Sequence, residues 1–341
     1  MPASHRIRRP RIYRPTATNL ARLAAALRRG AIVGVPSETV YGLAADALSP
    51  EACARIFEAK GRPTTDPLIV HIASASDLDR VAIADERAWR LARACWPGPL
   101  TLVLPKRPAV PDLVTAGKNT VAVRVPAHLQ FRRLIRLSGR PLAAPSANPF
   151  GYISPTTAAH VRDSLVGTSL KAVLDGGECA VGVESTIVDL SRPQGRPRLL
   201  RPGGLPVEEI ERILREPVSR PGNVRVAAGT AAPAPGMLAR HYSPRTPLKL
   251  YSRIDAATIA ALPSGDAALL LRRPRDVKEF AGRVRWLSES GQLKAIARNL
   301  FAMLRALDTA GWRCIHAEMP SGSDGLALAI RDRLTRAAAR R

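Results

Sequence analysis

The stretch Ile56-Phe-Glu-Ala-Lys-Gly-Arg-Pro-Thr-Thr-Asp-Pro-Leu-Ile-Val-His-Ile72 joins a helix end, a proline-rich loop and an apolar strand. It predicts a helix that ends at Lys60, with Gly61 as a left-handed cap and Pro63 as the residue that stops the helix. A short buried strand at 68–70 follows the loop. The rest of the α/β fold is expected to be built around this helix, loop and strand.

Two cations, Lys60 and Arg62, lie on the turn at the helix end. A lysine point charge and a planar arginine fork are complementary phosphate ligands, so the pair suits a polyphosphate. The same residues also fit an ordinary helix terminus, because cations complement the helix dipole there. Taken alone, the stretch favours the capped helix end, and a binding role depends on what else converges on it.

The length and composition indicate a globular protein with two domains. The chain has 341 residues, of which 46% are hydrophobic. This is enough for two separate cores. No apolar run reaches the roughly 18 residues of a membrane span, and residues 1–10 lack the apolar core of a secretory signal. We therefore expect a cytoplasmic protein without a membrane segment.

The four cysteines, Cys53, Cys95, Cys179 and Cys314, are far apart in the sequence and form no C-x-x-C pair. This spacing indicates neither a zinc site nor a disulfide framework. We expect reduced and mostly buried thiols, and no metal ligands among the site residues.

The formal net charge is +24, from 52 Lys and Arg against 28 Asp and Glu. A field of this sign attracts polyanions such as nucleotides and RNA. The arginines are scattered along the chain, however, so solvated surface charge explains them equally well. Charge alone does not assign a nucleic-acid partner.

Hydrophobic periodicity predicts an α/β domain over residues 1–215. The predicted helices are 16–29, 50–60, 85–95, 127–137, 157–165 and 206–214. The predicted strands are 31–35, 68–70, 100–104, 120–125, 141–144, 172–175, 186–190 and 198–200. Some strands are joined by connections too short for a helical crossover, so we expect a mixed sheet.

Residues 216–247 are rich in Pro, Gly and Ala and lack periodicity, which predicts a linker. Its end, 234–244, carries aromatic and cationic side chains that a passive tether does not need, so we expect a lid over the site. Residues 248–341 predict a small Rossmann-like, doubly wound α/β domain. Its predicted strands are 248–251, 267–271 and 314–317, and its predicted helices are 293–308 and 326–336.

The sequence contains no P-loop, no dinucleotide fingerprint and no H-E-x-x-H or G-x-S-x-G motif. Polar loops instead follow several predicted strands. These loops are 37–41, 60–66, 146–148, 183–186 and 201–204. They offer hydroxyls, amides and cations without an evident general base. This inventory fits orientation and charge neutralisation at an activated phosphate better than covalent catalysis.

Six short motifs between residues 36 and 203 occur in the order that one known family shows. They are Pro36-Ser-Glu-Thr-Val-Tyr-Gly-Leu43, Lys60-Gly-Arg-Pro63 with Pro67-Leu-Ile-Val-His71, Trp96-Pro-Gly-Pro99, Ser146-Ala-Asn148, Gly182-Val-Glu-Ser-Thr186 and Arg201-Pro-Gly203. Residues 14–214 therefore resemble the threonylcarbamoyl-AMP synthase family with its YrdC-like domain, a twisted mixed sheet with flanking helices. His241-Tyr-Ser-Pro244 and the trailing α/β domain resemble the longer, two-domain form of that family.

The resemblance implies that L-threonine, bicarbonate or CO2, and ATP are condensed to threonylcarbamoyl-AMP with release of pyrophosphate. The product would feed the threonylcarbamoyl modification of adenosine beside the tRNA anticodon. A downstream tRNA threonylcarbamoyl-transferase machinery is therefore an implied partner, and a tRNA contact through the basic surface is a further expectation. Mg²⁺ is expected to arrive with the ATP phosphates, because the sequence shows no compact carboxylate cluster.

The resemblance also assigns site residues. Lys60 and Arg62 would be catalytic. The expected ATP contacts are Lys60, Arg62, Asp66, Thr120, Ser146, Asn148, Ser154, Arg201, His241 and Tyr242. The expected threonine pocket consists of Thr39, His71, Arg124 and Ser185. Ser37 and Asp66 stand where the family commonly has Thr and Asn, which puts the fine contacts of these two side chains in doubt.

Other readings stay open at this point. His71 also fits a structural histidine at a strand end, Arg124 a solvated strand residue, Ser185 a strand cap and Tyr242 a domain-packing aromatic. A carbamoyl-transfer maturation protein would use a related YrdC-like domain, but this sequence shows no zinc fingers or acylphosphatase-like segment. A double-stranded-RNA-binding or regulatory module would exploit the +24 charge without needing threonine-pocket residues.

Overall fold

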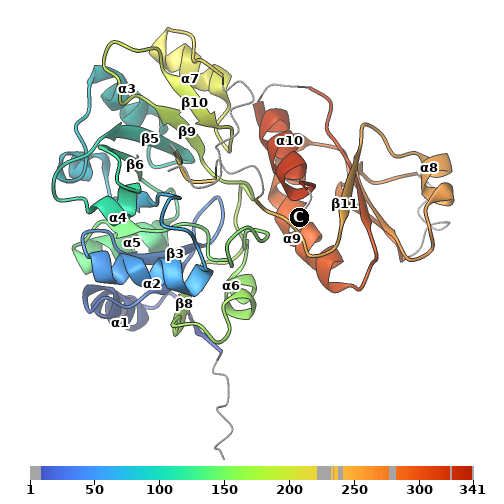
Figure 1. The fold of residues 1–341 in the computed structure, drawn as a ribbon, viewed down its shortest axis with the longest axis horizontal. Helices are drawn as coiled ribbons and strands as arrows, with labels where there is room; N and C mark the ends of the chain where they lie inside the picture. The colour runs from blue at the N-terminus through green and yellow to red at the C-terminus, as the bar shows by residue number, and fades with distance from the viewer. Residues whose placement is uncertain are drawn as a thin grey trace, which may run out of the picture.

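The computed structural model describes residues 9–220, 232, 234–236, 241–275, 282–322 and 325–339. These residues form two bodies, each built on its own sheet (Figure 1). We call the described residues up to 220 the large body and those from 248 onward the small body. Part of the predicted linker, at 221–231, 233 and 237–240, lies outside the described residues.

The large body contains the elements that surround the site. Its helices are α1 (Ala17–Arg28), α2 (Pro50–Lys60), the 3-10 helix η1 (Ala75–Arg80), α3 (Glu86–Cys95), α4 (Asp112–Thr115), α5 (Leu129–Ser138), α6 (Ala158–Ser164) and α7 (Val207–Leu214). Its strands are β1 (Arg11–Tyr13), β2 (Val33–Val35), β3 (Gly42–Asp46), β4 (Ile69–His71), β5 (Leu100–Pro105), β6 (Thr120–Arg124), β7 (Leu142–Ala143), β8 (Ala172–Leu174), β9 (Thr186–Asp189) and β10 (Arg198–Arg201).

The ten strands form one mixed sheet in the order β1-β8-β2-β3-β7-β4-β6-β5-β9-β10. The sheet contains both parallel pairs, such as β4 with β6, and antiparallel pairs, such as β2 with β3. The apolar stripes of α1 and α5 pack together over one part of the sheet. The largest core includes the buried faces of α2, α3 and α7. The mixed strand order predicted from the short connections is thus confirmed.

Two strands of the large sheet, β1 and β3, were not predicted. The sequence placed residues up to 43 in a loop, but β3 begins at Gly42. Its residues, Gly-Leu-Ala-Ala-Asp, have weak intrinsic strand preference. All five are buried, and β3 pairs on one side with β2 and on the other with β7. Pairing within a sheet therefore overrides local propensity here.

The small body has four strands and three helices among its described residues. They are β11 (Leu248–Tyr251), α8 (Ala256–Ala261), β12 (Ala267–Arg272), β13 (Val284–Ser288), α9 (Leu293–Thr309), β14 (Ile315–Glu318) and α10 (Gly325–Ala337). The sheet order is β11-β14-β12-β13, and all its pairs are parallel, which confirms the doubly wound prediction. None of the described helices is both long enough and apolar enough to cross a membrane.

The two bodies meet through α9 and α10, which lie between the small sheet and the large body (Figure 1). Arg305 of α9 is buried at this contact and donates to the carbonyls of Ile153 and Ser154 and to the Ser164 hydroxyl. Its guanidinium also lies 5.0 Å from the centre of the Tyr152 ring. A buried charge is stable only when it has such partners. The contact between the two bodies is therefore a specific interface.

Candidate functional site

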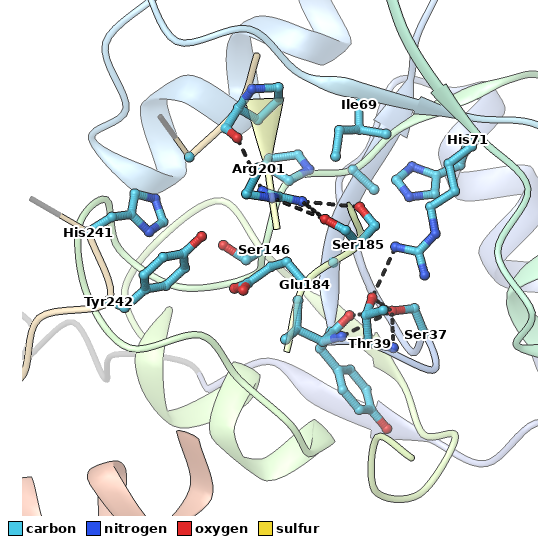
Figure 2. A pocket seen from close by; sticks show the side chains of 18 of the residues that line it. Ser37, Thr39, Ile69, His71, Ser146, Glu184, Ser185, Arg201, His241 and Tyr242 are labelled. Atoms are coloured by element: carbon cyan, nitrogen blue, oxygen red, sulfur yellow. Dashed lines mark hydrogen bonds between the residues drawn. The ribbon is translucent and has the colours of Figure 1, made fainter. Parts of the chain in front are cut away.

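A cavity lies where the loops after β2 and β7, the ends of β4 and β6, and the end of the linker meet (Figure 2). Nine of the expected site residues line it. They are Thr39, Arg62, His71, Arg124, Ser146, Ser185, Arg201, His241 and Tyr242. His241 and Tyr242 lie at one end of the cavity and His71, Ser37 and Thr39 at the other (Figure 2). The expected site residues therefore form two groups, one at each end of the cavity.

The remaining expected residues occupy other places. Lys60, Asp66 and Ser154 are each bonded to a residue that lines the cavity. Asn148 lies in the same loop as Ser146. Thr120 starts β6, at the opposite end of the strand from Arg124, and does not line the cavity.

Helix α2 positions the two cations as its sequence specifies. Ser49 caps its first turn by accepting from the Ala52 amide, and Gly61 closes its last turn with φ 59°. The ammonium of Lys60 donates to the carbonyl of Ser146 at 2.6 Å and also to that of Asn148. The K-x-R turn is therefore bonded directly to the S-x-N loop.

Arg62 is held just as firmly. Its guanidinium donates to the carbonyls of Asp66, at 2.9 Å, and Pro67, at 2.6 Å, and forms an ion pair with the Asp66 carboxylate at 3.0 Å. Burial lowers the pKa of Lys60 well below its ordinary value, and the adjacent Arg62 charge lowers it further. An anionic ligand at this turn would favour the protonated form of Lys60 and so raise its pKa again.

The other end of the cavity is organised by β4 and β6. Their parallel register places His71 opposite Arg124. Arg124 is buried and donates to Glu38 at 2.6 Å, to the Thr39 hydroxyl at 3.0 Å and to the Gly98 carbonyl at 3.1 Å. Arg124 is therefore not a solvated strand residue.

Glu38, the partner of Arg124, is itself an acid in a buried setting. Burial raises its pKa, but the charge of Arg124 and hydrogen bonds outweigh burial, so the net shift is downward. The pair is consequently ionised at neutral pH.

His71 is kept neutral by its surroundings. Burial, together with the nearby Arg124 charge, lowers its pKa to about 3, and its ring lies 5.2 Å from that of Phe131. A neutral imidazole in this position can accept or donate a hydrogen bond without adding a further positive charge.

This shift predicts a pH dependence of stability. The unfolded chain binds a proton at His71 near pH 6.5, whereas the folded chain does so only near pH 3. Folding stability is therefore lost as pH falls through this window. In urea unfolding between pH 6.5 and 4.5, the variant His71→Gln should have a shallower slope, by up to about 1.4 kcal/mol per pH unit. A residual slope is expected from His160, whose pKa burial lowers to about 4. Identical slopes for the two proteins would contradict the prediction.

Arg201 connects three segments around the middle of the cavity (Figure 2). It donates to the backbone carbonyl and the hydroxyl of Ser185, at 3.0 and 3.1 Å, and to the carbonyl of Pro235 at 3.1 Å. Ser185 in turn shares a hydrogen bond of 2.8 Å with Thr101 on β5. The arginine thus joins the loop before β9 to the described part of the linker.

Tyr242 is buried in an unusual backbone conformation, with φ 66°. A non-glycine residue adopts this region rarely and at a cost. Its ring stacks on Phe301 of α9, with ring centres 5.4 Å apart, and the Arg333 guanidinium lies 5.0 Å from its centre. The small body therefore holds Tyr242 against the cavity.

Several buried polar atoms of the expected site residues have no hydrogen-bond partner among the described residues. They include Oδ1 of Asn148, Nδ1 of His241 and the hydroxyl of Tyr242, and, at the other end of the cavity, Nδ1 of His71. Buried polar atoms are normally paired, so this concentration of unpaired atoms marks a place for a polar ligand.

Sequence reasoning missed three residues that complete the site. Glu184 accepts from the Ser154 hydroxyl and from Nε of Arg333, both at 2.6 Å. Arg333, on α10, is fully buried and also donates to the Pro202 carbonyl at 3.0 Å. Glu38 and Glu184 lie inside the quoted motifs, where a carboxylate in a buried loop signals a cationic partner. Arg333 is one of many arginines in the sequence and lies on a predicted helix, so nothing in the sequence pointed to a role in the site.

The comparisons with known proteins agree with this geometry. Residues 25–203 match the family model described as telomere recombination, and residues 205–339 match the C-terminal domain of threonylcarbamoyl-AMP synthase. The fold and the site thus define a protein of the YrdC-like class with the additional C-terminal domain.

The threonylcarbamoyl-AMP synthase of Pyrococcus abyssi is 44% identical over 91% of each chain, and that of Bacillus subtilis is 40% identical over 94% of this chain and 92% of its own. The crystal structure of P. abyssi Sua5 complexed with L-threonine superposes with a TM-score of 0.86, at 41% identity over 96% of each chain. This chain belongs to the threonylcarbamoyl-AMP synthase family, as the sequence motifs predicted.

Proposed function

We propose that this protein is an L-threonylcarbamoyladenylate synthase, which condenses L-threonine, bicarbonate or CO2, and ATP to threonylcarbamoyl-AMP and pyrophosphate. The observation that carries the proposal is one cavity with two chemically different ends. Lys60 of the K-x-R turn is hydrogen-bonded to the S-x-N loop, and the His71 and Arg124 pair lies across the same space. The threonine complex of the P. abyssi relative supports the amino-acid substrate.

The nucleotide would occupy the end that His241 and Tyr242 cover. Lys60, Arg62 and Arg201 supply the positive charge for the phosphates, and the unpaired atoms of Asn148, His241 and Tyr242 accept or donate to the nucleotide. Ser146 and Ser154 complete this end. Asp66 orients Arg62 through their ion pair, and Thr120 would be an outlying contact.

Threonine would occupy the opposite end. The fork of Arg124 binds the carboxylate, with Thr39 fixed beside it by a hydrogen bond of 3.0 Å. His71 and Ser185 offer polar atoms to the amine and the hydroxyl. The surrounding arginines raise the cost of a second cation, which lowers the pKa of the threonine ammonium and favours the neutral amine that reacts with CO2. The carbamate oxygen then attacks the α-phosphorus in line with the departing pyrophosphate.

Negative charge grows on the pyrophosphate as it leaves, and Lys60 and Arg62 are placed to stabilise it. Each carboxylate at the cavity is already paired with an arginine: Asp66 with Arg62, Glu38 with Arg124, and Glu184 with Arg333. The donor set therefore fits Mg²⁺ held mainly by the ATP phosphates. The ion would supply further charge neutralisation at those oxygens.

The product is a labile mixed anhydride. His241 and Tyr242 would exclude water from it while the cavity is closed. A downstream tRNA threonylcarbamoyl-transferase machinery in the cytoplasm would then take it up before it hydrolyses, and the basic surface of the chain would assist a tRNA contact.

The proposal predicts that pyrophosphate release requires both threonine and bicarbonate. The purified chain with ATP and Mg²⁺ should release pyrophosphate at least about tenfold faster with threonine than with serine, because the threonine methyl adds apolar contact in a closed pocket. Omitting either threonine or bicarbonate should reduce the rate of pyrophosphate release to background. Equal release without an amino acid would indicate a simple ATP pyrophosphatase.

The role of Arg124 is tested by Arg124→Lys. Lysine keeps the charge but cannot bond Glu38, Thr39 and Gly98 while also gripping a carboxylate. We expect the KM for threonine to rise about 10- to 100-fold and the KM for ATP to change little. Arg133→Lys, at an exposed position on α5, is the matched control. A selective rise in the KM for ATP would place threonine elsewhere.

A further inference from the structure

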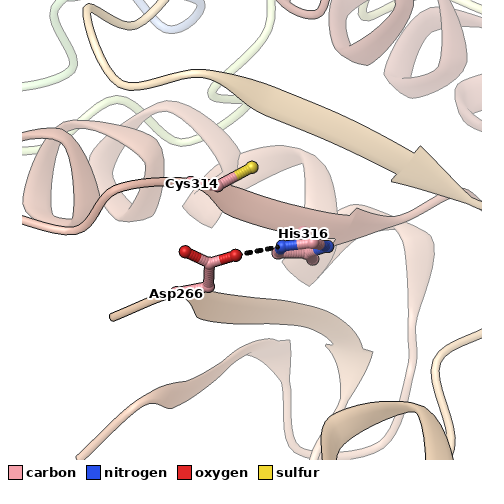
Figure 3. A group of neighbouring side chains, drawn as sticks. All are labelled: Asp266, Cys314 and His316. Atoms are coloured by element: carbon pink, nitrogen blue, oxygen red, sulfur yellow. Dashed lines mark hydrogen bonds and ion pairs between the residues drawn. The ribbon is translucent and has the colours of Figure 1, made fainter. Parts of the chain in front are cut away.

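A second group of chemically active side chains lies in the small body, away from the cavity. Ala267 of β12 pairs with Ile315 of β14, so the preceding residues, Asp266 and Cys314, are neighbours at the start of the two strands. His316 lies two residues after Cys314 on the same strand, and residues at this spacing share a face of the sheet. The register therefore brings a carboxylate, a thiol and an imidazole together (Figure 3).

The three side chains are buried and close. One ligand atom from each of Asp266, Cys314 and His316 lies within 4.8 Å of the others. The carboxylate of Asp266 is 2.9 Å from Nε2 of His316, which is near the separation of two ligand atoms that share one small cation. Sulfur, nitrogen and oxygen donors of these types are the ones that Zn²⁺ takes in proteins.

The surroundings of the His316 imidazole also suit a metal-binding histidine. Nδ1 of His316 is 2.9 Å from the hydroxyl of Tyr251 on the neighbouring strand β11. A metal-bound histidine commonly donates its second N–H to an oxygen, which fixes the orientation of its ring. Because a hydroxyl can donate or accept, Tyr251 satisfies Nδ1 both with and without an ion on Nε2.

We propose that Asp266, Cys314 and His316 form a site for a zinc-class divalent cation, with Tyr251 as the residue that positions the imidazole. On binding, the Cys314 thiol releases one proton to solvent and becomes a thiolate ligand. His316 donates its Nε2 lone pair and keeps its remaining proton on Nδ1, toward Tyr251. Asp266 supplies one oxygen, and the fourth position of a tetrahedral site is left for water or another small ligand.

The site is separate in chemistry from the Mg²⁺ that travels with ATP. Mg²⁺ prefers oxygen ligands and does not select a thiolate, so the two ions would not compete for the same atoms. Since β12 and β14 each supply ligands and β11 supplies Tyr251, a bound ion would stabilise three adjacent strands of the small sheet. This group could not be predicted from the sequence, because the cysteine spacing alone does not reveal which strands become neighbours.

The test is cobalt titration of the full-length chain after treatment with a chelator, without nucleotide. We expect one Co²⁺ per chain, with a thiolate-to-cobalt charge-transfer band in the near ultraviolet that Zn²⁺ then abolishes. The band should be absent in Cys314→Ser and preserved in Cys95→Ser, the matched control at the half-buried cysteine of α3. In Tyr251→Phe, the affinity should fall about tenfold with the band retained.

Zn²⁺ should also raise the melting temperature of the wild type and of Cys95→Ser, but not that of Cys314→Ser or Asp266→Asn. Circular dichroism without metal checks that each variant is folded. The absence of a charge-transfer band in the wild type, or an unchanged band in Cys314→Ser, would overturn the proposal. In that case Asp266, His316 and Tyr251 form a hydrogen-bonded network, and Cys314 is a neighbouring thiol that binds no metal.

Discussion

Lys60→Met is expected to reduce the rate of threonine-dependent pyrophosphate release by roughly two to three orders of magnitude. The substitution removes a positive charge beside the position that we propose for the departing pyrophosphate. It also removes the ammonium that donates to the carbonyls of Ser146 and Asn148, so the S-x-N loop loses two of its hydrogen bonds to α2. Methionine retains the length of the side chain and fills most of its volume.

The measurement is a single-turnover assay with saturating ATP and threonine. Lys171→Met, at an exposed position in the large body, is the matched control and should keep the wild-type rate. Circular dichroism and the melting temperature establish whether Lys60→Met is folded. A folded variant with a near-normal rate would reduce Lys60 to a capping residue at a helix end.

Arg333→Met should destabilise the protein by about 3–5 kcal/mol, although Arg333 lies in the small body. Glu184 accepts hydrogen bonds from Ser154 and from Arg333. Without Arg333, the buried Glu184 carboxylate keeps only the Ser154 hydroxyl of these two partners. It also removes the donor to the Pro202 carbonyl and the cation next to the Tyr242 ring. Burial lowers the pKa of Arg333, but Tyr242, Glu184 and Asp332 outweigh it and raise the pKa overall, so the guanidinium stays charged.

Urea unfolding with analysis of both midpoint and slope measures this effect. Arg331→Met is the matched control on the same helix, because Arg331 donates only to Pro320 in the small body among the described contacts. Adding Glu184→Gln to Arg333→Met should recover a large part of the lost stability, since the amide carries no charge. A loss below about 1 kcal/mol for Arg333→Met would show that solvent compensates Glu184.

The segments that the sequence predicted well are those whose cause is local. Helix α2 is specified by Ser49 at its start and Gly61 at its end, and both act as capping residues in the structure. The two strands that carry His71 and Arg124 also followed from the local pattern, to within one residue at their ends. Their position opposite each other did not, because it depends on the register of two strands that are distant in sequence.

What the sequence could not show depends on contacts between distant segments. Strand β3 forms because partners lie on both sides of it, and its own residues barely favour a strand. Arg333 reaches Glu184 across 149 positions of the chain. The assignment of ATP and threonine contacts remains a prediction from motif resemblance, and the structure adds the carboxylates Glu38 and Glu184 to the residues worth testing.

The left-handed backbone of Tyr242 has a consequence for how the cavity opens. A residue with a Cβ in this region carries about 1–3 kcal/mol of strain, which the contacts with Phe301 and Arg333 must outweigh. The closed arrangement is therefore the strained one. If α9 and α10 loosen their hold, the strain at Tyr242 is no longer offset, and we expect its ring to turn away from the proposed nucleotide end of the cavity. We therefore expect closing to require the small body, and opening to require only the release of its contacts.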